Sequence, residues 1–196
     1  MNVIFDIGKV LIDFNFEEFT ADLIGEEAAQ AVIAASWHDP QWDLLDKGEM
    51  DFESVLEVFI SKAPQYEAQI RQVFSRIGEI PKMRSYAIPL IKELKSKGHN
   101  VYYLSNYFTH LMKAAPQALE FTKYMDGGVF SCNEHITKPD ERIYKILCQR
   151  YCLEPQECVF IDDTLKNVTA AQALGIRGIH FTGQSPEQLL EQILQE

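Results

Sequence analysis

The sequence lacks long apolar runs and has few basic residues. No uninterrupted apolar segment approaches the roughly 20 residues that a membrane-spanning helix needs. Lys and Arg number 18 against 29 Asp and Glu, which gives a formal net charge of −11. Such an acidic surface is unsuited to nucleic acid or to an anionic membrane. We therefore expect a soluble protein whose main partner is neither of these.

The cysteine pattern of a zinc site or of a disulfide framework is also missing. The four cysteines, Cys132, Cys148, Cys152 and Cys158, form no Cys-x-x-Cys pair. Cys148 and Cys152 lie four residues apart on a predicted helix, but no second pair completes a metal site, so we interpret all four as buried, reduced thiols. The N-terminus has no basic segment followed by a long apolar one, as a secretion signal has. Together these absences predict a cytoplasmic protein.

What the sequence does contain is an alternation of short apolar segments with amphipathic helices. Strands that alternate with helices form a parallel sheet that helices cover on both faces. We therefore predict an α/β fold with a three-layer, Rossmann-like parallel sheet. The last helix should begin at Ser185-Pro186-Glu187-Gln188, which has the form of a capping box. The predicted strands cover residues 3–5, 100–104, 128–130, 158–161 and 176–181, and the helices between them 87–97, 107–119, 140–152 and 164–174.

Residues 14–80 break this alternation, because they contain no convincing strand. Aromatic and aliphatic residues recur at helical spacing from Phe16 onward, and Asp51 is placed to cap a further helix. We expect these residues to form a helical cap domain. It would be inserted into a core domain built from residues 1–13 and 81–196.

Charged and polar residues cluster where the predicted core strands end. Ligands of parallel α/β sheets bind at this carboxyl edge of the strands. Helix capping explains any one of these residues, but not four such positions together in this order. They are Asp6 after the first strand, Ser105 and Asn106 after the second, Lys138 in the loop after the third, and Asp162 and Asp163 after the fourth.

This set of residues suits the cleavage of a phosphate ester. The substrate is a dianion, which repels a carboxylate nucleophile unless a cation neutralises both charges. Mg²⁺ does so with hard oxygen ligands, and one or two carboxylates plus a backbone carbonyl suffice to bind it. A lysine and a hydroxyl with neighbouring backbone N–H groups would hold the transferring phosphoryl oxygens. Asp6 would then attack phosphorus and form an aspartyl-phosphate, which water hydrolyses.

Four segments around these residues have the form of family motifs. They are Phe5-Asp6-Ile7-Gly8-Lys9-Val10-Leu11, Leu104-Ser105-Asn106, Lys138-Pro139-Asp140-Glu141-Arg142-Ile143-Tyr144 and Phe160-Ile161-Asp162-Asp163-Thr164-Leu165-Lys166-Asn167. Their residues and their order are similar to the four motifs of the haloacid dehalogenase (HAD) superfamily, in the group with a helical cap after the first strand. The resemblance spans the whole chain and implies a hydrolase with this fold.

The resemblance also implies a role for each residue. Asp6 would be the nucleophile and a ligand of Mg²⁺, and the backbone carbonyl of Gly8 would be a second ligand. Asp163 would bind the metal directly, with Asp162 in or near its coordination. The remaining three residues would bind phosphate or substrate: Ser105, Asn106 and Lys138, the last also paired with Asp6 and acting in catalysis.

Gly8 departs from most phosphatases of the superfamily, which have a second Asp at this position as general acid and base. Glycine allows a tight turn where a side chain would obstruct, and it still offers its carbonyl, but it moves no proton. Two interpretations stay open: a phosphatase that works without this acid, or a non-catalytic relative that binds phosphorylated ligands. The form Asp-x-Gly-x-Val also resembles a branch containing an α-D-glucose-1-phosphate phosphatase. It favours a Mg²⁺-dependent phosphatase of a sugar phosphate such as glucose 1-phosphate.

A 2-haloacid dehalogenase is the third interpretation. That branch of the superfamily likewise lacks the second Asp, since a halide leaves without a proton. Dehalogenation needs no metal, however, and the Asp162-Asp163 pair favours a metal site.

Substrate specificity is expected to reside in the cap. Trp37, His38 and Trp42 lie near a predicted cap loop and would either contact a sugar or pack within the cap. Asp46 is expected to be solvated.

Because Gly8 supplies no proton, the leaving oxygen must depart charged or take a proton from water or the cap, where His38 is the first residue to test. Without such a donor, sugar 1-phosphates should be hydrolysed faster than sugar 6-phosphates.

Overall fold

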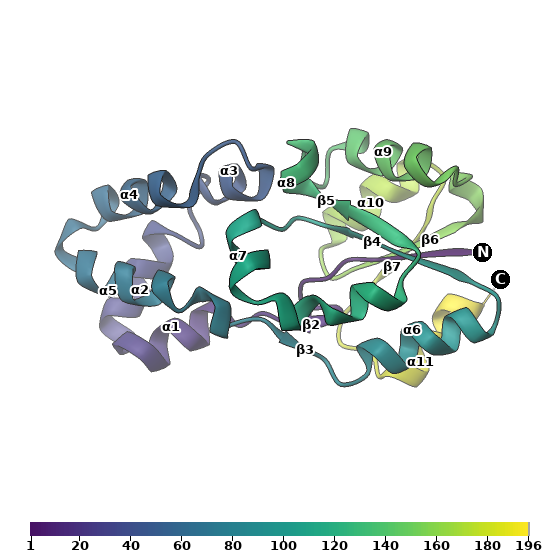
Figure 1. The fold of residues 1–196 in the computed structure, drawn as a ribbon, viewed down its shortest axis with the longest axis horizontal. Coiled ribbons are helices and arrows are strands. Elements are labelled where there is room, and N and C mark those ends of the chain that lie inside the picture. Colours follow the sequence, from purple (N-terminus) through teal and green to yellow (C-terminus); the bar gives the residue numbers. More distant parts are fainter. Residues whose placement is uncertain (196) are drawn as a thin grey trace.

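The computed structural model describes residues 1–195 and contains a five-stranded sheet with helices on both faces (Figure 1). The strand order is β5-β4-β1-β6-β7, and each strand runs parallel to its neighbours. This confirms the predicted α/β fold with a Rossmann-like parallel sheet. The strands are β1 (Asn2–Phe5), β4 (Asn100–Ser105), β5 (Gly127–Phe130), β6 (Cys158–Asp162) and β7 (Arg177–His180).

β1 occupies the centre of the sheet because it is apolar on both faces. Val3 and Phe5 pack into the core on the side of α6 and α11, and Ile4 packs into the core on the side of α9 and α10. Burying an aliphatic or aromatic side chain of this size stabilises the fold by about 1.5–3 kcal/mol. The covering helices are α6 (Ala87–Ser96), α9 (Glu141–Tyr151), α10 (Leu165–Ala173) and α11 (Pro186–Leu194).

Five helices that follow β1 lie together at one end of the sheet, at the left of Figure 1. Aromatic rings fill the space between them, with the Trp42 ring centroid 5.5 Å from that of Phe16 and 6.3 Å from that of Phe59. Asp51 caps α4 as predicted, since its side chain accepts a hydrogen bond from the Ser54 N–H. The helices are α1 (Phe16–Ile24), α2 (Glu26–Ala35), α3 (Trp42–Lys47), α4 (Phe52–Lys62) and α5 (Glu67–Ser75).

A short antiparallel ribbon joins these helices to the sheet. β2 (Ile12–Asp13) pairs with β3 (Lys82–Met83), so that the segments before and after the five helices lie side by side (Figure 1). Arg84 forms an ion pair with Asp13 at 2.9 Å beside this ribbon. The sequence did not predict the ribbon. The division into a core domain and a cap domain stays a prediction.

The helix predicted over residues 107–119, with a break or restart at Pro116, begins later than predicted and breaks where expected. α7 covers only Thr109–Ala114, and a 3₁₀ segment, η3 (Pro116–Tyr124), follows it. Pro116 has no N–H to continue the α-helical hydrogen bonds, so the helix ends before it. The remaining short elements are α8 (Ser131–Glu134), η1 (Pro64–Tyr66), η2 (Ile77–Glu79) and η4 (Pro155–Glu157).

Two expectations from composition can be compared with the structure. No helix within residues 1–195 has the length and apolar character needed to cross a membrane. All four cysteines are free thiols, with Cys132 and Cys158 buried and Cys148 half-buried. Cys152 is exposed, so the expectation of a buried thiol is wrong there. It lies at the C-terminal end of α9, where the helix surface meets solvent.

The capping box at the start of α11 provides a first test. The Ser185 hydroxyl accepts a hydrogen bond from the Gln188 N–H at 3.3 Å, and the Gln188 side chain accepts one from the Ser185 N–H at 3.0 Å. We expect Ser185→Ala to lower the free energy of unfolding by about 1 kcal/mol, measured by urea denaturation. Ser96→Ala, at an exposed position at the end of α6, is the control and should change stability by less than about 0.5 kcal/mol. Equal effects of the two substitutions would contradict the role of the cap.

Candidate active site

The carboxyl ends of three neighbouring strands bring the predicted site residues together. β1 lies between β4 and β6, with Phe5 beside Tyr103 on one strand and Ile161 on the other. The residues that follow these strands therefore share one edge of the sheet, next to a cavity of about 220 Å³. Asp162 is fully buried behind that cavity. The predicted residues that line the cavity are Asp6, Gly8, Ser105, Asn106, Lys138 and Asp163.

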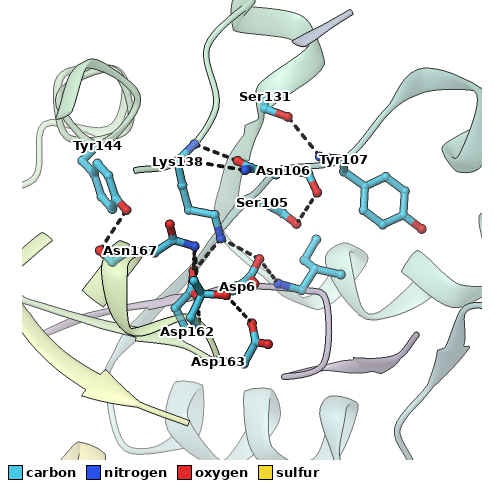
Figure 2. Close-up of polar contacts among 12 residues, drawn as sticks. Asp6, Ser105, Asn106, Tyr107, Ser131, Lys138, Tyr144, Asp162, Asp163 and Asn167 are labelled. Atoms are coloured by element: carbon cyan, nitrogen blue, oxygen red, sulfur yellow. Dashed lines mark hydrogen bonds and ion pairs between the residues drawn. The ribbon is translucent and has the colours of Figure 1, made fainter. Parts of the chain in front are cut away.

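The Lys138 ammonium is the centre of this cluster. Its Nζ lies 2.8 Å from Asp6 Oδ1 and 2.7 Å from Asp162 Oδ2, and the residue is only 4% exposed (Figure 2). Burial alone would lower the pKa of this ammonium, but the two carboxylates outweigh it and hold the pKa above its usual value. Lys138 is therefore a fixed positive charge beside the Asp6 carboxylate.

The side chain of Asn106 holds the backbone of Lys138 in place. Its amide oxygen accepts a hydrogen bond from the Lys138 N–H at 2.8 Å, and its amide nitrogen donates to the Lys138 carbonyl at 3.1 Å (Figure 2). Asn106 follows β4, whereas Lys138 lies in the loop between α8 and α9. The paired amides thus fix that loop to the edge of the sheet and aim Lys138 at Asp6.

The Asp162 carboxylate accepts hydrogen bonds from groups of the protein and does not line the cavity. Its Oδ1 accepts a hydrogen bond from the Thr164 N–H at 2.7 Å, and both its oxygens lie 3.1 Å from the side-chain nitrogen of Asn167. Together with Lys138, these donors occupy the Asp162 carboxylate (Figure 2). Tyr144 in turn donates a hydrogen bond to the Asn167 carbonyl at 2.9 Å. Asn167 is a site residue to which sequence reasoning gave no role, although it lies within the fourth motif.

Three carboxylates lie close together around the buried Lys138 ammonium. One oxygen each of Asp6, Asp162 and Asp163 lie within 4.8 Å of one another. Burial, together with the neighbouring carboxylates, raises the pKa of Asp6 to about 7 in spite of Lys138. Burial and Asp162 also raise the pKa of Asp163. A cluster with this excess of negative charge and hard oxygen donors fits a divalent cation such as Mg²⁺.

Comparison with known proteins identifies the family. The family model described as haloacid dehalogenase-like hydrolase matches residues 1–175. The chain belongs to the haloacid dehalogenase-like hydrolases. Figure 2 shows how residues from all four of its motif-like segments meet in this hydrolase: Asp6, Ser105, Asn106, Lys138, Asp162 and Asp163.

Relatives of this hydrolase differ in length and in name. A sesquiterpene phosphatase of Aspergillus oryzae, astK, is 24% identical over 91% of this chain and 88% of its own length. The mouse acyl-CoA dehydrogenase family member 10 is 32% identical over 70% of this chain, which spans only 13% of that protein. The HAD family enzyme bt-2542 of Bacteroides thetaiotaomicron, solved with magnesium and inorganic phosphate, has a TM-score of 0.75. It is 22% identical, and the match covers 96% of this chain and 98% of that one.

The backbone of this hydrolase does not require a glycine at position 8. Gly8 lies outside the left-handed region, which Lys9 adopts instead with φ 58°. A Cβ atom added at Gly8 would meet no atom within 4 Å. The expectation that a side chain would obstruct the turn is therefore wrong. The missing side chain leaves space in the cavity beside Asp6.

Aromatic side chains form the wall of the cavity opposite the carboxylates. Trp37 and Trp42 line it and also pack edge to face, with ring centroids 4.8 Å apart. The packing alternative is therefore confirmed for Trp37 and Trp42, and contact with a sugar stays a prediction. His38 does not line the cavity; it is exposed and pairs with Glu17 at 3.0 Å. His38 is thus wrongly placed to supply a proton.

Asp46 is the residue that the sequence interpretation misjudged most. We expected it to be solvated, but it lines the cavity together with Asp6 and Lys138. Burial, followed by the charge of Asp43, raises its pKa to about 8. Asp46 lies one turn after Trp42 on α3, so both face the same way. That spacing is the signal that would have placed it in the site.

The hydroxyl of Ser131 provides a test of how the site is supported. It accepts a hydrogen bond from the Tyr107 N–H at 3.0 Å and donates one to the Asp46 carbonyl. Ser131→Ala leaves the buried Tyr107 N–H without this partner, so we expect the free energy of unfolding to fall by about 1–3 kcal/mol. Denaturant titration measures this loss. Thr169→Ala, at an exposed hydroxyl that also bonds a carbonyl, is the matched control, and a loss no larger than its own would disprove the role of Ser131.

Proposed function

We propose that this hydrolase is a Mg²⁺-dependent phosphatase that cleaves a small phosphorylated metabolite through an aspartyl-phosphate on Asp6. The observation that carries the proposal is the buried Lys138 ammonium between Asp6 and Asp162, with Asp163 in the same cluster. The phosphatase named among its relatives supports a phosphate substrate. The magnesium and phosphate bound to the Bacteroides enzyme support the same metal and ligand here.

Asp6 is oriented for attack by its own contacts. Its Oδ1 accepts hydrogen bonds from the Ile7 N–H at 2.7 Å and from Lys138, which leaves Oδ2 free to attack phosphorus. As the bond from phosphorus to the leaving oxygen breaks, the Lys138 ammonium stabilises the negative charge on the phosphoryl group. The Ser105 hydroxyl makes only a long contact of 3.4 Å to the Asn106 carbonyl, so it is available to a phosphoryl oxygen. Water then hydrolyses the aspartyl-phosphate.

The carboxylates fit Mg²⁺ in charge and in donor type. Asp6, Asp163 and the backbone carbonyl of Gly8 would hold it at the cavity surface, with Asp162 behind them. Bound there, Mg²⁺ would offset the charge of the phosphate dianion and of the carboxylates that face it. Asp162 would contribute through Lys138 and Asn167, because its oxygens already accept their hydrogen bonds.

For the substrate we propose a sugar phosphate such as glucose 1-phosphate. The Asp-x-Gly-x-Val form of the first motif supports it, as does the aromatic wall formed by Trp37, Trp42 and Phe14. Sugar rings commonly stack on such faces through their C–H groups. The cavity of about 220 Å³ accommodates a small organic group next to the phosphate position.

Replacing the nucleophile tests the covalent mechanism. Asp6→Asn removes the attacking carboxylate, so we expect turnover of sugar phosphates and of 4-nitrophenyl phosphate to fall below detection while circular dichroism is unchanged. Asp22→Asn, at an exposed position on α1, is the control and should retain full activity. Turnover of Asp6→Asn at the wild-type rate would contradict the mechanism. Chloride release from 2-haloacids without metal would favour a dehalogenase instead.

Replacing the second carboxylate tests the metal site. Mg²⁺ bound only to the folded state should raise the melting temperature, and Asp163→Asn should remove most of that increase. Differential scanning fluorimetry with and without Mg²⁺ measures both. The control is Asp126→Asn, whose carboxylate pairs with Lys95 and directly precedes β5, at the amino edge of the sheet. Equal Mg²⁺ effects in wild type and Asp163→Asn would refute the assignment. If sugar phosphates with Mg²⁺ stabilise a wild type that hydrolyses none of them, the chain is a binding protein.

A further inference from the structure

Position 8 leaves the leaving oxygen without a proton donor from the core. Among residues 1–195, three acidic side chains line the cavity: Asp6, Asp46 and Asp163. The proposed function assigns Asp6 to attack and Asp163 to the metal. Tyr107 also lines the cavity, but burial raises the pKa of its hydroxyl far above neutral pH and makes it a poor acid. Asp46 is the remaining acid, and it comes from the opposite wall.

Hydrogen bonds from the core fix α3 so that Asp46 faces the cavity. The Ser131 hydroxyl donates to the Asp46 carbonyl, the His135 ring lies 2.9 Å from the Lys47 carbonyl, and Thr137 donates to Asp43 Oδ1 at 2.9 Å. These three donors come from α8 and the loop that carries Lys138. Asp46 and Lys138 are therefore held by one continuous stretch of the core.

Gly48 allows this close approach of α3 to the core. Its backbone adopts φ 63°, and a Cβ atom there would lie 2.7 Å from the Cys132 carbonyl oxygen. Both facts favour glycine at this position. Because Gly48 ends α3 two residues after Asp46, the contact with Cys132 limits how far the Asp46 side chain can move from the cavity.

The environment of Asp46 raises the pKa of its carboxyl to about 8, which favours the protonated form at neutral pH. Burial is the main cause of the raised pKa, the carboxylates of Asp43 and Asp6 add to it, and Lys138 opposes it. A carboxyl in this state can give a proton and take one back, as general acid–base catalysis requires. The titratable groups that face it are Asp43 on its own helix, Asp6 and Lys138 across the cavity, Tyr107 after β4 and Cys132 on α8.

We propose that Asp46 of α3 donates the proton to the leaving oxygen, in the role that position 8 does not fill. The proposal rests on the proposed phosphatase function. An Asp6 oxygen bonds to phosphorus, the bond from phosphorus to the leaving oxygen breaks, and the leaving oxygen keeps that electron pair and takes the Asp46 proton. In the second step water attacks phosphorus, Asp46 takes a proton from that water, and the bond between Asp6 and phosphorus breaks. Free phosphate is released and Asp46 is protonated again.

The dependence of rate on the leaving group tests this proposal. With Mg²⁺, Asp46→Asn should reduce kcat/KM about 10²–10⁴-fold for an alkyl ester such as glucose 6-phosphate, and far less for 4-nitrophenyl phosphate, whose leaving group needs no proton. We use kcat/KM because it reports the step in which the leaving oxygen departs, and not the later hydrolysis that all esters share. Glu53→Gln, which removes an exposed carboxylate on α4, is the control and should leave the ratio of these two rates unchanged. An equal loss on both esters, or no loss on the alkyl ester, would overturn the proposal.

The pH profile tests it without a change at Asp46. In the wild type, kcat/KM for the alkyl ester should fall as pH rises through the pKa of the donor, whereas kcat/KM for the aryl ester should not. Asp43→Asn removes a neighbouring negative charge and should move this fall to lower pH. The same profile for both esters would overturn the proposal.

A substitution at position 8 provides a rescue. The open space beside Gly8 accepts a side chain, so Gly8→Asp added to Asp46→Asn should restore alkyl-ester turnover at least tenfold. If turnover does not recover, and if Asp46→Asn alone reduces the turnover of alkyl and aryl esters equally, then Asp46 has a structural role. If the proposed phosphatase function is wrong, the wild type will hydrolyse none of these esters and Asp6→Asn will behave like the wild type. That outcome differs from every outcome that contradicts the role of Asp46.

Discussion

A buried ammonium paired with two carboxylates is the constraint on which the site depends. A charge as buried as that of Lys138 is tolerated only with partners in good geometry, and removing one partner of such a pair typically costs about 3–5 kcal/mol. Lys138 therefore fixes the position of Asp6 after β1 and of Asp162 at the end of β6. Asn106 extends the same network to the residue after β4. Four segments far apart in the sequence are held in one arrangement by one charge.

The topology of the sheet explains why these segments meet. Because β1 lies between β4 and β6 and all three run parallel, their carboxyl ends face the same side. Side chains that follow the strands at this edge face the cavity and lie near backbone N–H groups. Residues within the strands are instead buried by helices on both sides. The chemistry therefore lies at the end of a rigid element rather than along it.

The sequence predicted the site residues at the edge of the sheet far better than those that the helical segment brings to the cavity. Asp6, Lys138 and Asp163 follow strands whose apolar runs are local and readable, and the alternation of strands with helices predicts that these strands are parallel. Asp46 was judged wrongly because its surroundings depend on how α3 packs against α8, a contact between residues more than 80 positions apart. His38 was judged wrongly because it pairs with Glu17 of α1 instead of lining the cavity. Gly8 was misread for a similar reason. Its place directly after the first strand suggested that the turn requires a glycine. A Cβ atom at this position would meet no atom within 4 Å, so the turn would also accept another residue.

The β2–β3 ribbon has a consequence for how this fold tolerates change in length. Since Ile12 faces Met83 and Asp13 faces Lys82, the ends of the segment between them are already closed into a loop. The entropy lost on closing a loop grows only with the logarithm of its length, about 0.6 kcal/mol for each doubling. Insertions or deletions in that loop away from α3 therefore cost the sheet little. The two short strands therefore make the stability of the sheet and of its carboxyl edge largely independent of variation in the helices beyond them.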